Sequence, residues 1–397
     1  MKLGDWMKRC GVAIPLAMLA TGCGDFWQAP TGGGTCTSNC TTATSGDFYI
    51  LNAGTSPEIV GESIVSGNLT ALSGSPWTLE GTPYSMAIAP NGDFLVVSTT
   101  SGVFSYPITS GELGTAVVVS TDQAYAVQVD GTDSWVLEAL PGTGGVVVGA
   151  VPVNSITGAG SGTEKTAAFT ISNAAVQTNK MVISPDNAHV FVPLGAGGTI
   201  AVAFNAASGS SPLGSSATVI PVENSGGLAL SVAVDPSTTP RLFYIGETLG
   251  NSAGTSGGLR AFNYSSLGSG TLTQAPGSPL ASGGLAPNFI LPAAKGQYVY
   301  VANGAGASSA GNVTGFSITA SSAATPVYTV ASTTSTAAGV QPLGLAEDST
   351  GTFVFAVGSL GSPYFDAYTF DATTTGQLDS QILSTTASSS IAIVATP

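Results

Sequence analysis

Basic residues are scarce in this chain. Its 397 residues include eight Lys and Arg against 22 Asp and Glu, and a single histidine. Nucleic-acid binding depends on clustered Lys and Arg that displace phosphate counterions, so this composition excludes it. Recognition of a phosphorylated sugar also favours Arg and Lys and is disfavoured for the same reason. The acidic excess instead keeps a surface rich in Gly, Ser and Thr soluble.

A long apolar run is also missing. The longest candidate, VAIPLAMLA at residues 12–20, follows three basic residues and is too short to span a bilayer as a helix. A basic start, a short apolar core and small residues in that order indicate a bacterial export signal. The sequence LATGC resembles a lipobox in which Cys23 becomes lipid-modified, although Ala20 stands where Leu is commonest. We therefore expect residues 1–22 to be a lipoprotein signal peptide, with a plain export signal as the alternative.

Residues 23–45 are rich in Gly, Ser and Thr and predict a flexible tether. Lipid chains on Cys23 would hold the protein to a membrane. Gly24 follows this cysteine, and the absence of Asp there favours the outer membrane, on its periplasmic or surface side. Removal of the signal leaves five basic and 21 acidic residues, a formal net charge of −16, and we expect a monomer.

Cysteines are few, and the four have separate expected fates. Cys10 leaves with the signal and Cys23 carries lipid, so Cys36 and Cys40 remain. Disulfides persist in the oxidising compartment that an export signal implies, and we expect these two thiols to form one. A metal site is the weaker alternative, because two thiols without a nearby histidine supply half of a zinc site at best.

What the chain does contain is a repeat. Six segments each combine a short apolar strand, a turn of Pro, Asp, Gly or Asn, and a second apolar strand. Period-two alternation runs through them, and 53 glycines and 23 prolines leave little room for helices. Their first strands end 41 to 56 residues apart, which is typical of four-stranded propeller blades. The anchor residues lie near Ile88, Val129, Ile183, Val234, Ile290 and Ala346.

The chain ends supply a further blade. SSSIAIVATP at the C-terminus is a first strand without a second, and GDFYILNAG near residue 46 is a second strand without a first. Pairing them covers two edges that would otherwise be open. We therefore predict an all-β fold: one seven-bladed β-propeller over residues 46–397, with one blade closed by the N- and C-terminal strands. Six or eight blades are the alternatives.

The units PAAKGQYVYVANG and SPDNAHVFVPLG, and the following strand NVTGFSI, resemble the YVTN-type repeats of the lactonase family of seven-bladed propellers. That family includes bacterial 6-phosphogluconolactonases. The resemblance implies basic and acidic side chains at the channel mouth and an inner-strand start of the form G-P-R-H. The matching start here is LAPNFILP, so Asn288 and Phe289 stand where Arg and His would be. Lys180 is the one basic side chain near an inner-strand start.

Polar side chains end several of the second strands. We expect them around one rim, where carboxylate and amide oxygens suit Ca²⁺ or a hydroxyl-rich sugar; ordinary solvation is the alternative. Catalytic candidates are Glu138, Glu247 and Lys180, and binding candidates are Asn52, Ser98 and Asn303. No cofactor is expected beyond the possibility of Ca²⁺.

The single histidine, His189, begins a second strand in HVFVPL and should share a face with Phe191. We expect it at a strand edge beside the turn, away from the channel mouth. The segments GNSAG and GTSGG match the G-x-S-x-G nucleophile motif, but no helix and no histidine partner accompany them. Chance explains both matches in a chain so rich in Gly and Ser.

Aspartates in the turns and aromatic rings at one strand position recur along the chain, and we expect both to have a structural role. Turn aspartates should bond to nearby backbone amides, and ring side chains at one strand position should pack between blades. The aspartates are Asp93, Asp130, Asp186 and Asp235, and the rings are Phe94, Trp135, Phe191, Phe243, Tyr300 and Phe355.

Three functions fit these features. The first is an envelope-anchored, non-catalytic propeller that binds a glycan or protein partner. The second is a divergent lactonase that hydrolyses an uncharged lactone, and the third is a structural envelope component. Convergence of Glu138, Glu247 and Lys180 in the channel would favour the enzyme, and their dispersal would favour binding.

Overall fold

The computed structural model describes residues 44–293, 296–304, 311–322, 327–339, 341–360, 363–371, 373–374, 376–384 and 389–397. The expected signal peptide, Cys23 and the Cys36–Cys40 pair lie outside these residues, as does the tether up to residue 43. Ser45, the last residue of the expected tether, is buried and its Oγ accepts a hydrogen bond from the backbone N–H of Ile64 at 2.8 Å.

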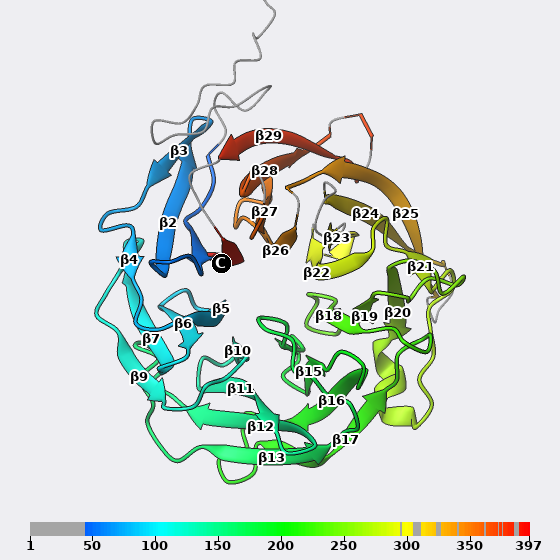
Figure 1. The fold of residues 1–397 in the computed structure, drawn as a ribbon, viewed down its shortest axis with the longest axis horizontal. Helices are drawn as coiled ribbons and strands as arrows, with labels where there is room; N and C mark the ends of the chain where they lie inside the picture. Colours follow the sequence, from blue (N-terminus) through cyan, green and yellow to red (C-terminus); the bar gives the residue numbers. More distant parts are fainter. Residues whose placement is uncertain are drawn as a thin grey trace, which may run out of the picture.

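Seven antiparallel sheets surround a central axis (Figure 1). We number them as blades 1 to 7. Blade 1 contains β5 (Pro83–Ile88), β6 (Phe94–Thr99), β7 (Gly102–Thr109), β8 (Glu112–Leu113) and β9 (Val117–Ser120). Blade 2 contains β10 (Ala126–Val129), β11 (Trp135–Gly142), β12 (Gly145–Pro152) and β13 (Lys165–Thr170). Blade 3 contains β14 (Val182–Ile183), β15 (His189–Pro193), β16 (Thr199–Phe204) and β17 (Leu213–Ile220).

The remaining blades follow the same plan. Blade 4 contains β18 (Ala229–Val234), β19 (Leu242–Glu247), β20 (Gly258–Asn263) and β21 (Leu280–Ala281). Blade 5 contains β22 (Ala286–Ala293), β23 (Tyr298–Gly304), β24 (Asn312–Ala320) and β25 (Tyr328–Ala337). Blade 6 contains β26 (Pro342–Glu347), β27 (Phe353–Gly358), β28 (Phe365–Phe370) and β29 (Leu378–Ser384). Blade 7 contains β30 (Ser390–Ala395), β1 (Phe48–Asn52), β2 (Glu58–Val65), β3 (Asn68–Ala71) and β4 (Trp77–Thr78).

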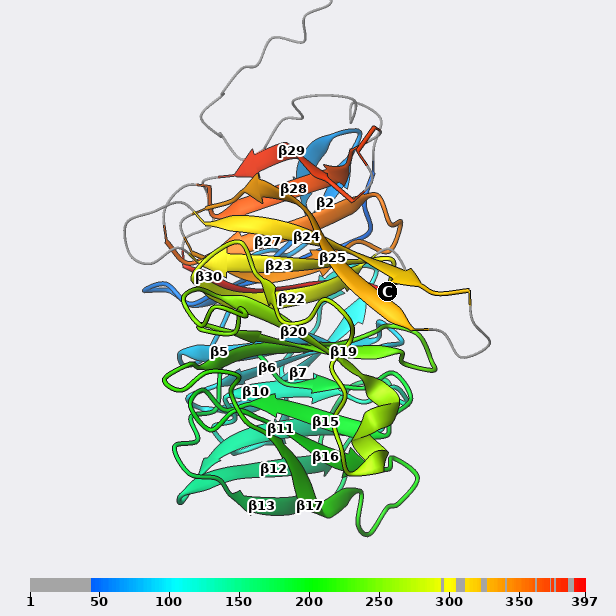
Figure 2. The same ribbon diagram turned by 90° about the vertical axis from the view of Figure 1, so that its right-hand side faces the viewer.

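The predicted seven-bladed architecture is confirmed, and so is the composite blade. β30 is the inner strand of blade 7 and pairs antiparallel with β1, in a register that joins Phe48 to Ala395 and Ile50 to Ile393. The C-terminus therefore ends beside the central axis (Figure 1). Seen from the side, the blades lie against one another along the ring (Figure 2). Closure by main-chain hydrogen bonds gives β1 a paired strand on both sides, β2 and β30, so that β1 is not an open edge.

The hydrophobic core is divided into seven clusters, one between each pair of neighbouring blades. Successive side chains of a strand point to opposite faces of the blade, and both faces pack against a neighbouring blade. Both faces of every blade are therefore apolar. The recurrent rings are 0–5% exposed and belong to these clusters, which confirms their predicted role in packing between blades. They are Phe94, Trp135, Phe191, Phe243, Tyr300 and Phe355.

The prediction that turn aspartates bond to nearby backbone amides is confirmed for Asp130 and Asp235. Asp130 accepts hydrogen bonds from the N–H groups of Ser134 and Trp135 at 2.8 and 2.7 Å. Asp235 accepts one from Ser237 at 3.0 Å. Asp93 differs, since its carboxylate accepts from the side chain of Asn91 at 3.1 Å. Each turn thus fixes the angle between the first and second strands of its blade.

One segment departs from the expected strand-and-turn pattern. After β20 the chain forms a 3-10 helix, η1 (Tyr264–Ser269), whose Tyr264 and Leu267 are buried. The ring of Tyr264 packs against Phe191 of blade 3, so tertiary packing overrides the local turn preference. Within the described residues, no helix has the length and apolar character needed to cross a bilayer.

Candidate functional site

The central channel is the first candidate site. It holds a cavity of about 420 Å³ to which the inner region of every blade contributes. The lining strands are β5, β10, β14, β18, β22, β26 and β30. Most of the lining side chains are apolar. The polar ones include Gln128, Asn179, Lys180 and Glu347.

Lys180 lies at the start of the inner strand region of blade 3 and reaches across the channel. Its Nζ donates a hydrogen bond to the carbonyl oxygen of Leu343 in β26 at 2.6 Å. The same Nζ lies 4.6 Å from the ring centroid of Phe289 in β22. Burial inside the channel lowers the pKa of Lys180 from 10.5 to about 7. A substantial fraction of this amine is therefore neutral near pH 7.

The positions where Arg and His were expected lie beside this lysine. Phe289 stacks near the ammonium group, and the side-chain amide of Asn288 donates to the carbonyl of Pro342 at 3.0 Å. The side chain of Asn179 is bound to blade 1, since its Oδ1 accepts a hydrogen bond from Ser85 Oγ of β5 at 3.0 Å. Lys180 is thus the only cation among the residues that line the described cavity.

Glu138 does not join Lys180. It lies in β11 between blades 1 and 2, is fully buried, and accepts a hydrogen bond from Ser120 Oγ at 2.7 Å. The pKa of Glu138 is raised to about 8, chiefly by burial and in part by the nearby carboxyls of Glu164 and Asp122, while the hydrogen bond from Ser120 lowers it. It is not among the residues that line the channel cavity.

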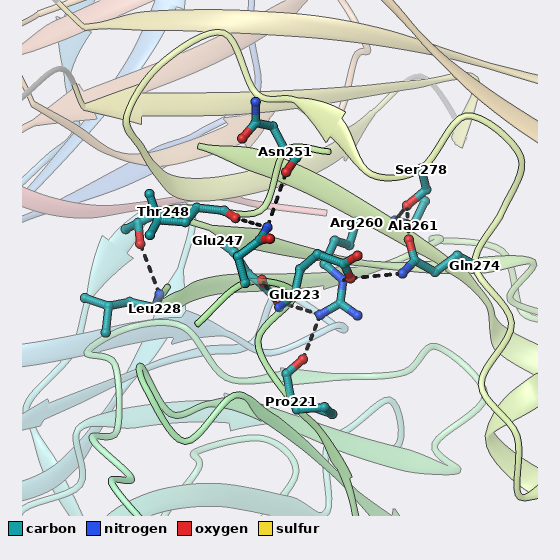
Figure 3. Close-up of polar contacts among 12 residues, drawn as sticks. Pro221, Glu223, Leu228, Glu247, Thr248, Asn251, Arg260, Ala261, Gln274 and Ser278 are labelled. Carbon is teal, nitrogen blue, oxygen red and sulfur yellow. Dashed lines mark hydrogen bonds and ion pairs between the residues drawn. The ribbon is translucent and has the colours of Figure 1, made fainter. Parts of the chain in front are cut away.

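Glu247 is held in an ion-pair network between blades 3 and 4 (Figure 3). Arg260 Nη1 lies 2.7 Å from Glu247 Oε1 and donates to the carbonyl of Pro221 at 2.8 Å. Arg260 Nε lies 3.0 Å from Glu223 Oε2, and Glu223 donates its backbone N–H to Glu247 at 2.8 Å. The carboxylate of Glu247 is 1% exposed, so this network joins the blades rather than facing the channel.

The three predicted binding residues are buried as well. Asn52 accepts a hydrogen bond from Ser390 Oγ at 2.8 Å and so links the two terminal strands. Asn303 donates to the carbonyl of Ser282 at 2.7 Å. Ser98 is fully buried in β6. These three side chains therefore do not form a solvent-exposed rim, because the connections between blades cover the ends of the second strands. Their role in binding stays a prediction.

His189 occupies a strand edge, as predicted. It begins β15, is half-buried, and its ring lies 6.2 Å from that of Phe191. Its Nδ1 lies 2.9 Å from the hydroxyl of Tyr264, and that hydroxyl donates to Asp186 at 2.8 Å. The pKa of His189 is lowered, because burial disfavours the charged ring more than the carboxylate of Asp186 favours it. This polar chain joins blade 3 to η1, and His189 does not line the channel cavity.

One carboxylate cluster was not expected from the sequence. Asp122, Glu138 and Glu164 each place an oxygen within 4.8 Å of the other two. Asp122 lies between β9 and β10, and Glu164 lies just before β13, so neither stands at the end of a second strand. The available signal was an acidic residue in a blade connection close to a buried strand glutamate.

No family model and no curated protein sequence matches the chain. Solved structures match it as folds. A protein of Bacteroides fragilis NCTC 9343, described provisionally as a 6-phosphogluconolactonase, is 14% identical with a TM-score of 0.64, over 90% of this chain and 99% of its own. The periplasmic gluconolactonase of Pseudomonas aeruginosa is 16% identical with a TM-score of 0.60, over 89% and 100%. A functionally unknown protein of Desulfotomaculum acetoxidans DSM 771 is 11% identical with a TM-score of 0.59, over 89% and 100%. At these identities the likeness establishes the seven-bladed propeller fold alone.

Proposed function

We propose that this protein is an envelope-anchored propeller that binds a small uncharged ligand, such as the end of a glycan, at the Lys180 end of its central channel. The observation that supports this most is the separation of the chemical groups. Lys180 lies in the channel, while Glu138 and Glu247 are buried in two different blade interfaces. Glu347 also lines this cavity, but Lys180 forms no ion pair with a carboxylate of the described residues. A lysine in such surroundings suits hydrogen bonding to a ligand better than acid–base catalysis.

The cavity supports a ligand of this class. Its volume of about 420 Å³ lies in the range of small-molecule sites, which are mostly apolar with a few placed polar groups. An ammonium group has three N–H donors, and Leu343 accepts one of them. Sugar hydroxyls are suitable acceptors for the others, and Phe289, beside the Lys180 ammonium group, adds apolar surface to the cavity lining.

The anchor in this proposal is Cys23. A multiply acylated cysteine would hold the propeller stably at the membrane, and the Gly/Ser/Thr-rich segment would let the domain reach a partner. Incorporation of a labelled fatty acid tests this in bacterial cells that express the whole chain. We expect the wild type to incorporate the label and Cys23→Ser to incorporate none. An unlabelled wild type would contradict the lipid anchor and would leave a plain export signal as the interpretation.

A lactonase acting on an uncharged lactone is the second candidate. It is favoured by the pKa of Lys180, about 7, which suits a general base near neutral pH. In this reaction Lys180 takes a proton from water as the water oxygen attacks the lactone carbonyl. The ring C–O bond of the tetrahedral intermediate then breaks, and Lys180 returns the proton to the leaving alkoxide oxygen, giving a hydroxy acid. Two of the structurally similar proteins are described as lactonases, which agrees with this candidate.

One pair of assays separates the two candidates. The purified protein is offered neutral glycans in a binding array, and uncharged γ- and δ-lactones in a hydrolysis assay. We expect glycan binding that is lost in Lys180→Met, without lactone turnover. Turnover that Lys180→Met abolishes would replace the binding proposal with the lactonase. If the protein neither binds a glycan nor hydrolyses a lactone, the remaining candidate is a structural component of the envelope.

A further inference from the structure

A second site, apart from the channel, is formed where blade 1 joins blade 2. Asp122 in the connection, Glu138 in β11 and Glu164 before β13 each offer one carboxylate oxygen, and these three atoms lie within 4.8 Å of one another. Oxygens on opposite sides of one Ca²⁺ lie up to about 5 Å apart, because each Ca–O distance is about 2.3–2.6 Å. The three carboxylates are therefore close enough to share a single ion.

Two oxygen atoms in this cluster have unmet hydrogen-bonding capacity. Glu138 is 0% exposed, and its Oε1 accepts from Ser120 while its Oε2 has no hydrogen-bond partner among the described residues. Glu164 Oε1 is also buried and without a partner there. A buried carboxylate oxygen without a partner is costly, and a cation is one of the few groups that satisfies it.

The backbone makes room for this arrangement at Gly149. This residue pairs with Glu138 on one side and with Thr166 on the other, in the middle of β12. A Cβ atom on Gly149 would lie 2.0 Å from Glu164 Oε1 and 3.6 Å from the Cβ of Glu138. The glycine therefore lets the Glu164 carboxylate lie directly over the strand, next to Glu138.

The interface between blades 3 and 4 shows how the same fold neutralises clustered acids. There Glu247, also in a second strand, and Glu223, also in a blade connection, both pair with Arg260. Between blades 1 and 2, no Lys, Arg or His of the described chain forms an ion pair with Asp122, Glu138 or Glu164. Three carboxylates this close repel one another unless a positive charge or shared protons offset the repulsion.

We propose that Asp122, Glu138 and Glu164 bind a divalent cation, Ca²⁺, that holds blade 1 to blade 2. Hard carboxylate oxygens without nitrogen or sulfur ligands favour Ca²⁺ over transition metals. Asp122 and Glu164 are only half-buried, so the ion reaches the cluster from solvent and water completes its coordination. The site serves the ring itself and does not depend on what the channel binds.

Calorimetry and thermal unfolding test this site on the whole chain after EDTA treatment and buffer exchange. We expect Ca²⁺ to bind with a Kd on the order of 10⁻⁵ to 10⁻³ M and to raise Tm by several degrees at saturation. Mg²⁺ should bind more weakly, because it gives up its water ligands reluctantly.

The half-exposed variants Glu164→Gln and Asp122→Asn should fold and should each weaken Ca²⁺ binding at least tenfold. Gly149→Ala should do the same by displacing Glu164. The matched control is Glu223→Gln, which removes an acid from the other interface and should keep the full Ca²⁺ response. The proposal is overturned if the wild type shows neither heat nor a Tm shift, which would mean that protons alone stabilise the cluster. It is equally overturned if the response survives in Glu164→Gln and Asp122→Asn together.

Discussion

At the scale of single residues, the basic side chains of the described part of the chain have strongly different surroundings. Arg260 is 5% exposed and pairs with two glutamates, so its charge is offset. Arg241 pairs with the buried Asp235 at 2.5 Å. Lys180 has a carbonyl and an aromatic ring as its neighbours instead, and its channel position lowers its pKa to about 7. Because of this placement, the Lys180 amine loses its proton at a lower pH than a solvent-exposed lysine does.

Lys180→Met removes this desolvated charge and should stabilise the protein at low pH. The folded pKa of about 7 lies below the unfolded value of 10.5, so the wild type gains stability as pH rises from 7 to 10.5. Below pH 7 the charged amine costs stability, and we expect Lys180→Met to be more stable there by about 1–3 kcal/mol. Urea unfolding at pH 6 and pH 10 measures both. An advantage of the variant that grows toward pH 10 would contradict the assigned pKa.

Residue positions were predicted from the sequence better than residue surroundings were. Lys180 was placed at an inner-strand start because the repeat fixes where each blade begins, and the structure places it there. The burial of Asn52, Ser98 and Asn303 was missed, because period-two alternation does not show that a connection covers the strand end. The cluster of Asp122 with Glu138 and Glu164 depends on the paths of two connections, which carry no periodic signal.

At the scale of elements, polar contacts join neighbouring blades in addition to the apolar core between them. Between blades 3 and 4 the linking group is Arg260 of β20, which contacts Glu247 of β19, Glu223 and the carbonyl of Pro221. Its guanidinium also lies 4.8 Å from the ring of Phe262. One side chain thus offsets two carboxylates and satisfies a carbonyl in a buried interface.

Arg260→Met should therefore destabilise the propeller by about 3–5 kcal/mol, because it leaves Glu247 buried without its ion pair. Chemical denaturation at pH 7 measures the loss. The double variant Arg260→Met/Glu247→Gln should recover part of it, since the uncompensated charge is then removed. A double variant no more stable than Arg260→Met would show that packing of Arg260, and not its charge, joins the blades.

Among the elements, inner strands were predicted more accurately than outer ones. The anchors Ile88, Val129, Ile183 and Val234 are the last residues of β5, β10, β14 and β18. The outer parts of the blades vary, with β4, β8 and β21 only two residues long and η1 in place of a simple turn. Inner strands are constrained on both faces by neighbouring blades, whereas outer strands face solvent and accept more sequences.

At the scale of the whole molecule, buried acids make stability depend on pH. Asp366 in β28 is 4% exposed, and burial raises its pKa from 3.8 to about 7, although hydrogen bonds from Tyr368 and Gly339 lower it in part. The folded state therefore holds a proton that the unfolded state releases between pH 4 and pH 7. For this group, stability is greatest below pH 4 and is lost as pH rises to 7.

Asp366→Asn should remove this contribution and raise stability at pH 8 by about 2 kcal/mol relative to the wild type. The advantage should shrink toward pH 4, where the wild-type carboxyl is protonated in both states. Urea unfolding across this range measures it, and Glu112→Gln, on an exposed side chain, is the control. A constant difference at all pH values would contradict the assigned titration.

Ring closure is the other property of the whole molecule. Truncation before Ser390 removes β30 and leaves β1 as an open edge, and it also removes Ala392 and Ile393 from two blade interfaces. We expect the truncated protein to lose its cooperative thermal transition and to aggregate. Calorimetry and size-exclusion chromatography test this, with removal of Pro397 alone as the control. A truncated chain that stays monomeric with an unchanged Tm would show that the ring is stable without β30.

The pairing of β1 with β30 also makes ring closure a strongly non-local step in folding. The two strands pair along their main chains although more than 300 residues separate them in the sequence. Bringing segments this distant together costs chain entropy before their contacts can offset it, so we expect this pairing to form slowly. Until it forms, β1 presents an unpaired strand edge that can pair with another chain and begin aggregation.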